Sequence, residues 1–107
     1  MAHVRLVAIA PILVLVACAT APSHDGFVRS LHNNIGKSID TELTYCFRAH
    51  HVLGISALPN GREEYKHLIP PHRGVGSCPY SCEVDPRTRT VVAVRIDGLE
   101  KDCVQFP

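Results

Sequence analysis

Apolar and polar residues alternate most clearly near the C-terminal end of the chain. Between Thr90 and Ile96, Val92, Val94 and Ile96 fall on one face and Arg95 on the other. This period of two residues predicts a half-buried β-strand. Further strands are predicted at residues 52–58, 62–69 and 80–84. The turns Pro59-Asn60-Gly61 and Asp85-Pro86-Arg87-Thr88-Arg89 separate them, and Asn-Gly is a strong hairpin signal.

The preceding part of the chain shows helical spacing. Residues 26–34 are expected to form a helix that Asp25 caps and Gly36 follows, with Phe27, Leu31 and Ile35 on one face. A second helix is expected from Ser38 to about residue 50. Its buried stripe would comprise Ile39, Leu43, Cys46, Phe47 and His50.

This order of elements predicts an α+β fold. Consecutive strands joined by tight turns form a meander, so we expect a three- to four-stranded antiparallel sheet. Two N-terminal helices should pack on one face of it. The domain would occupy residues 26–107.

The first residues resemble an export signal. Residues 6–17 are uncharged and mostly aliphatic, but too short for a permanent membrane span. They end in Leu15-Val16-Ala17-Cys18, which resembles the lipobox of bacterial lipoproteins. This resemblance implies a signal peptide at residues 1–17, acylation (palmitate) of Cys18, and a short tether at residues 18–25. The alternative is plain secretion, with cleavage after Ala19 or Ala21.

Charge excludes some partners. The net charge is +1, and without Arg5 ten basic and ten acidic residues remain. A protein that binds nucleic acid needs an excess of basic residues, so we expect that this chain does not bind nucleic acid. The chain also lacks the nucleophile, phosphate-loop and zinc-protease motifs. Glu63 and Glu64 would face opposite sides of a strand. We therefore predict a non-enzymatic protein without a cofactor.

Four cysteines follow Cys18, and an even number in an exported small domain favours disulfides. Cys46 on the second helix and Cys82 on the inner face of a strand should meet in the core. Cys78 and Cys103 flank the last hairpin, which brings them together. Two alternatives stay open. One is a single disulfide with two buried thiols. The other is a metal site that combines these cysteines with His50, His51, His67 and His72.

Several short segments, taken in order, resemble the SmpA/OmlA-type (BamE-like) small outer-membrane lipoproteins. These segments are Ile35-Gly36-Lys37-Ser38-Ile39-Asp40, Asn60-Gly61-Arg62-Glu63-Glu64-Tyr65, Cys78, Val84-Asp85 with Thr88, and Gly98 leading to Cys103. One departure is Leu53-Gly54-Ile55, where family members often have a Gly-x-Pro turn. The resemblance implies a lipid-anchored α+β domain with non-enzymatic interaction roles, and it also suggests the Cys78–Cys103 pair. Its best-known member is an accessory of β-barrel assembly.

We therefore expect a lipid-anchored cell-envelope protein that presents the free face of its sheet to a protein partner. Ala19 after the lipidated cysteine favours the outer membrane, facing the periplasm, and a role in its assembly or integrity. One alternative is an enzyme inhibitor that uses the loop at residues 70–77. The other is a periplasmic metal-binding protein.

Overall fold

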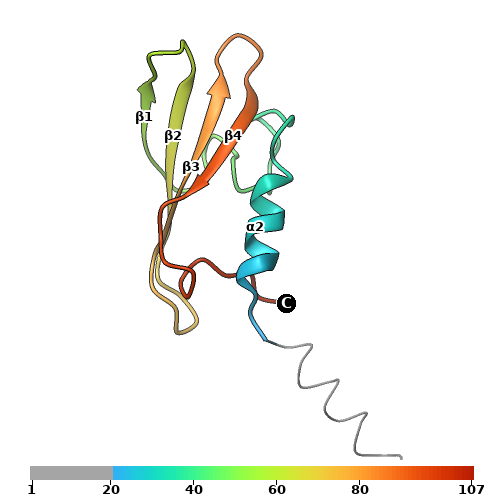
Figure 1. Ribbon diagram of the computed structural model, residues 1–107, viewed down its shortest axis with the longest axis vertical. Coiled ribbons are helices and arrows are strands. Elements are labelled where there is room, and N and C mark those ends of the chain that lie inside the picture. Colours follow the sequence, from blue (N-terminus) through green and yellow to red (C-terminus); the bar gives the residue numbers. More distant parts are fainter. Residues whose placement is uncertain (1–20) are drawn as a thin grey trace, which may run out of the picture.

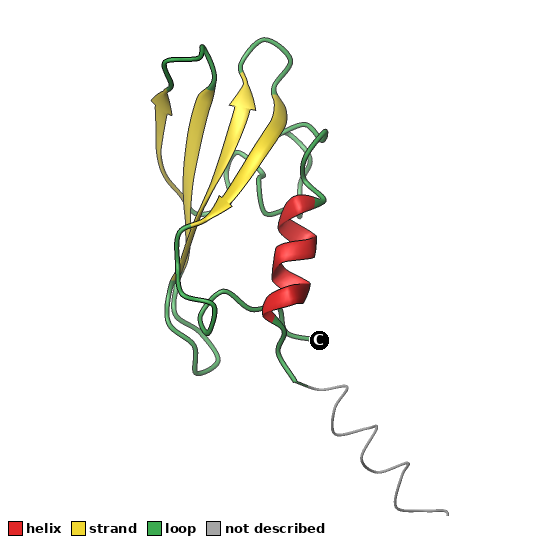
Figure 2. Ribbon diagram, in the orientation of Figure 1, coloured by secondary structure: helices red, strands yellow, loops and turns green. Residues whose placement is uncertain are grey.

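The computed structural model describes residues 21–107, which form one helix and one four-stranded sheet (Figures 1 and 2). The elements are α2 (His24–His32), β1 (Val52–Ala57), β2 (Glu63–Ile69), β3 (Cys78–Asp85) and β4 (Thr90–Ile96). The expected signal peptide and Cys18 lie outside the described residues. In the part of the chain that is described, no helix has the length and apolar character needed to cross a bilayer.

The sheet is antiparallel, with its strands in the order β1-β2-β3-β4. Its inner face is formed by side chains that share one parity across the register, such as Tyr65 opposite Cys82 and His67 opposite Tyr80. These four side chains are buried, as are Val84 and Val91. The opposite parity carries Glu64, Lys66, Glu83 and Arg95. The sheet is therefore covered on one face only, as its alternating sequence requires.

Helix α2 packs against β4 and covers part of the inner face (Figure 1). Phe27 and Leu31 are fully buried, as predicted. The ring centroid of Phe27 lies 4.9 Å from that of Tyr45 and 6.0 Å from that of Tyr80. Two details differ from expectation. The N-cap is Ser23, whose hydroxyl accepts a hydrogen bond from the Gly26 amide, and Ile35 lies beyond the helix and is exposed.

The predicted fold with two helices on the sheet is wrong, because the expected second helix is absent. Residues 38–50 instead form a series of turns, as Figure 2 shows. Ile39 and Cys46 are buried as the stripe predicted, but Leu43 is fully exposed in the left-handed region at φ 62°. The apolar spacing thus marks individual contacts with the core rather than one helical face.

Competing hydrogen bonds explain this difference. The Ile39 amide donates to the Arg89 carbonyl at 2.9 Å, and the Arg48 amide donates to the Ile39 carbonyl at 2.9 Å. In a helix the Arg48 amide would donate to the Thr44 carbonyl, so its bond to Ile39 replaces a helical bond. The Ile39 amide would lie in the first helical turn, where it has no helical partner, and it pairs with Arg89 instead. The segment is also poor in helix formers, because threonine, tyrosine, phenylalanine and histidine all lose side-chain freedom in a helix.

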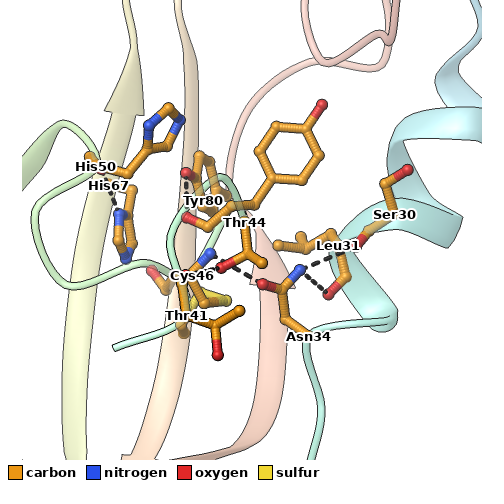
Figure 3. Close-up of a disulfide and its surroundings, with 12 residues drawn as sticks. Ser30, Leu31, Asn34, Thr41, Thr44, Cys46, His50, His67 and Tyr80 are labelled. Atoms are coloured by element: carbon orange, nitrogen blue, oxygen red, sulfur yellow. Dashed lines mark hydrogen bonds between the residues drawn. A yellow bond between two sulfur atoms is a disulfide. The ribbon is translucent and has the colours of Figure 1, made fainter. Parts of the chain in front are cut away.

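Asn34 connects the end of α2 to this irregular segment. Its side-chain amide donates to the carbonyls of Ser30 and Leu31, and its Oδ1 accepts a hydrogen bond from the Cys46 amide at 3.1 Å (Figure 3). Asn34 is 3% exposed. One buried side chain therefore provides hydrogen-bond partners for the Ser30 carbonyl and the Cys46 amide, and so joins the two segments.

Two disulfides hold the domain together. Cys46 is bonded to Cys82 and Cys78 to Cys103, so both predicted pairs are present. The first bond joins the irregular segment to β3, and the second joins the chain after β4 to the start of β3. Gly98 is needed beside the second bond, because a Cβ atom there would lie 2.7 Å from the ring of Pro79.

We predict that the double substitution Cys46→Ala/Cys82→Ala lowers the free energy of unfolding by about 3–4 kcal/mol, the loop-closure entropy of a bond between residues 36 positions apart. Urea titration followed by circular dichroism measures the change. The matched control Cys78→Ala/Cys103→Ala opens a shorter loop of similar entropy. A loss below about 1 kcal/mol for the first variant would contradict a stapling role for Cys46–Cys82.

Candidate interaction surface

The outer face of the sheet is a network of paired charges. The Arg95 guanidinium contacts Glu64 and Asp97, and the Lys66 ammonium lies 3.9 Å from Glu64. A separate ion pair links Arg62 to Glu83. Because acidic and basic groups neutralise each other across the strands, this face offers little net charge to a partner.

Asp97 accepts hydrogen bonds from two side chains of this network. Burial raises the pKa of its carboxyl, but hydrogen bonds from Arg95 and Ser81 outweigh that effect and leave the pKa below its usual value. The Ser81 hydroxyl is itself buried and donates to Asp97 at 2.8 Å. The polar groups of this face therefore satisfy one another.

The two edges of the sheet differ. On the β4 side, the Gly36 amide donates to the Val91 carbonyl at 2.8 Å, and the Val91 amide donates to the Lys37 carbonyl at 2.9 Å. Ser38 also forms an isolated bridge to Thr90. Residues 36–39 thus cover the first part of β4, and α2 packs beside it. Within residues 21–107, no segment is paired with the outer edge of β1.

Strand β1 carries the exposed apolar side chains of this open edge. Leu53 and Ile55 are 68% and 53% exposed and flank Gly54. The strand Val-Leu-Gly-Ile-Ser-Ala contains no charged residue and no proline. Both kinds of residue commonly prevent another strand from pairing with an exposed edge. A bulge between Val52 and Gly54 is the single irregularity in its pairing with β2.

The hydrogen-bond pattern shows which backbone groups of β1 point outward. The Leu58 amide donates to the Arg62 carbonyl just beyond the strand ends, so Leu58 and Arg62 form a hydrogen-bonded pair. Such pairs alternate in an antiparallel ladder, which directs the amide and carbonyl groups of Ile55 and Ala57 away from β2. These groups can accept one further strand.

A hollow lies between α2 and the irregular segment at residues 38–50. It has a volume of about 750 Å³, and its walls include Ser30, Asn33, Tyr45 and Phe47. Leu43 stands at its rim, fully exposed. Its lining mixes polar and apolar groups.

Histidines gather where the irregular segment meets the sheet. The His67 ring stacks on Tyr80 with centroids 4.9 Å apart, and its Nδ1 lies 2.6 Å from the His50 carbonyl (Figure 3). Nδ1 therefore donates, and Nε2 is left buried without a partner. Burial is the main cause that lowers the pKa of His67, opposed by the hydrogen bond to His50. Burial and His51 likewise lower the pKa of His50.

The structure does not bring the cysteines and histidines together as a metal site would require. The sulfur atoms of Cys46, Cys78, Cys82 and Cys103 are all in disulfides, so they are not thiolate ligands. In the described range, no group of three histidine, cysteine or acidic side chains is arranged to hold a metal ion. His72 lies in the loop at residues 70–77, near Phe106 and away from His67.

The open edge of β1 was not predicted from the sequence. Its signal was present, since residues 52–57 are an uncharged strand with apolar residues at both Leu53 and Ile55. Only pairing in three dimensions shows which edge is covered. Comparisons with family models, curated proteins and solved structures found no match to this chain.

We predict that acid destabilises the domain through His67. The unfolded side chain gains a proton near pH 6.5, whereas the buried ring resists it. The unfolded state therefore binds more protons, and the free energy of unfolding falls as the pH drops below about 6.5, by at most about 1.4 kcal/mol per pH unit from this group. His50 adds to the same slope. Chemical denaturation at several pH values between about 8 and 5 measures the change. The free energy of unfolding should fall less steeply with decreasing pH in His67→Phe than in the unchanged protein. Equal slopes in both proteins would contradict this assignment.

We also predict that Leu43→Asn stabilises the protein by about 0.5–1 kcal/mol. The left-handed conformation costs a branched residue about 1–2 kcal/mol, and asparagine tolerates it better. Because Leu43 is fully exposed, no core contact is lost. The midpoint of urea unfolding measures the gain, with Leu53→Asn, in an extended strand, as the control. A lower midpoint for Leu43→Asn would show that the leucine contributes to stability despite its exposure.

Proposed function

We propose that this chain is a lipid-anchored, non-enzymatic protein of the bacterial cell envelope. Acyl chains on Cys18 would attach it to the outer membrane, where it faces the periplasm. Its open β1 edge would bind an extended strand of a protein partner. The observation that carries the binding proposal is the contrast between the covered edge at β4 and the open, uncharged and apolar edge at β1.

The disulfides support the proposed location. Structural disulfides persist in oxidising compartments such as the periplasm and are rare in the cytosol. This domain has two, both at buried cysteines. The lipobox-like segment ending at Cys18 supplies the route to that compartment. The resemblance to SmpA/OmlA-type lipoproteins favours a role in outer-membrane assembly or integrity.

The chemistry of the edge defines the partner. Recognition would come from backbone hydrogen bonds to Ile55 and Ala57 and from apolar contacts with Leu53 and Ile55. The charges of the outer face are already paired with one another. Binding should therefore depend little on salt, and the partner segment should be an uncharged, apolar strand.

We predict that Ile55→Lys lowers partner capture in envelopes about tenfold, corresponding to about 1.4 kcal/mol. A charge on an open edge opposes strand addition, yet an exposed position costs little stability. The yield is measured by photo-crosslinking from a photo-reactive residue placed at Ser56, an exposed neighbour of Ile55. Mass spectrometry identifies the adduct. An envelope protein that is not a hydrolase is the expected partner.

Two further variants make this test specific. Leu43→Lys is the matched control, because it changes an exposed apolar residue at the hollow beside α2, away from β1. Ala57→Pro removes one outward amide while leaving the bonds between β1 and β2. Loss of capture in Ile55→Lys and Ala57→Pro, but not in Leu43→Lys, supports strand addition at β1. Loss in Leu43→Lys alone overturns that site, and capture of a hydrolase through residues 70–77 would instead support the inhibitor alternative.

A further inference from the structure

The chain enters the folded domain beside its last residues. The Ser23 amide donates to the Gln105 carbonyl, and the Gln105 amide donates to the Ser23 carbonyl, both at 2.9 Å. The loop at residues 70–77 and residues 99–107 lie at the same end of the molecule as the start of α2 (Figure 1). The turns at residues 58–62 and 86–89 lie at the opposite end. We call the first of these two ends the tether end.

Covalent geometry limits how far this end can move from a lipid on Cys18. Five peptide units separate Cys18 from Ser23, and they span about 18 Å at most when fully extended. Strand β2 runs along the sheet between the two ends, and its seven residues span about 20 Å. The anchor therefore holds the tether end near the bilayer, and the opposite turns are carried away from it.

The side chains of the tether end suit contact with phospholipid headgroups. Leu99 is 62% exposed, and Pro70 and Pro71 are exposed beside each other. The Arg73 guanidinium lies 4.3 Å from the centre of the half-buried Phe106 ring. Apolar and aromatic groups next to an arginine fit the boundary between headgroups and acyl chains.

The charges of this end select the kind of lipid surface. Its charged residues comprise Asp25, Glu100 and Asp102 against Arg29, Arg73 and Lys101. Acidic and basic groups are equal in number, so anionic lipid has no net positive patch to bind. Contact with a zwitterionic surface is consistent with this balance.

We infer that residues 70–77 and 99–107 rest on the headgroups of the membrane that carries the lipid of Cys18, an inference that rests on the anchor of the proposed function. The loop at residues 70–77 is then covered by the bilayer and closed to an enzyme cleft. The β1 edge stays accessible, because the strand runs away from the tether end (Figure 1).

Single tryptophan probes test this orientation, since the chain contains no tryptophan. The full lipidated protein is reconstituted into phosphatidylcholine vesicles with brominated acyl chains, which quench nearby indole fluorescence. Leu99→Trp and Pro71→Trp place probes in exposed positions at the tether end. Thr88→Trp is the matched control at an exposed turn of the opposite end.

We expect loss of fluorescence and a blue shift for Leu99→Trp and Pro71→Trp, with neither change for Thr88→Trp. Replacing part of the lipid with an anionic one should leave this contrast unchanged. Flotation with the vesicles tests the anchor separately. A protein that floats but shows equal quenching at both ends overturns the orientation alone. A protein that fails to float overturns the anchor and the orientation together.

Discussion

The bond between Cys46 and Cys82 is the constraint on which the rest of the domain depends. It fixes the irregular segment at residues 38–50 to the inner face of β3, where helix α2 alone does not cover the sheet. Two hydrogen bonds assist it, from the Cys46 amide to Asn34 and from the Tyr80 hydroxyl to the Tyr45 carbonyl (Figure 3). Burial raises the pKa of Tyr80 far above its usual value, so this hydroxyl remains a donor. A small domain gains stability from such a bond because its core is limited.

The same segment decides which edge of the sheet stays open. Residues 36–39 must run alongside β4 to bring Ile39 and Cys46 into the core, and in doing so they cover that edge. Asp40 then lies beside Arg48 and Arg89, and the hydrogen bond from Arg89 is the main cause that lowers its pKa to about 2. Within the described residues, no comparable segment runs along the outer edge of β1. Residues 36–39 therefore close one edge of the sheet, and the edge at β1 stays open within the described residues.

The sequence predicted the strands well and the second helix badly. The Asn60-Gly61 turn and the strand at Thr90–Ile96 report local preferences that the sheet preserves. The expected face of Val92, Val94 and Ile96 is wrong at Val92, because a bulge in β4 puts Val91 in the core instead. The apolar spacing from Ile39 to His50 correctly predicted that Ile39 and Cys46 are buried. The backbone between them is not helical, because hydrogen bonds beside β4 and the disulfide to Cys82 determine its path. Both disulfide pairs were predicted correctly, but Cys46 reaches Cys82 from a series of turns and not from the face of the expected helix. The open edge at β1 was not, because strand pairing on both sides had to be known.

We propose that one protein combines an oxidised folded domain with a lipid anchor at Cys18. Intact-mass analysis of the native protein, purified from its membrane without reducing agent, tests both parts at once. We expect an acylated species that begins at Cys18 and lacks the four hydrogens lost in forming two disulfides, two for each bond. An unmodified chain that retains its first residues and has all five of its cysteines as free thiols would contradict it.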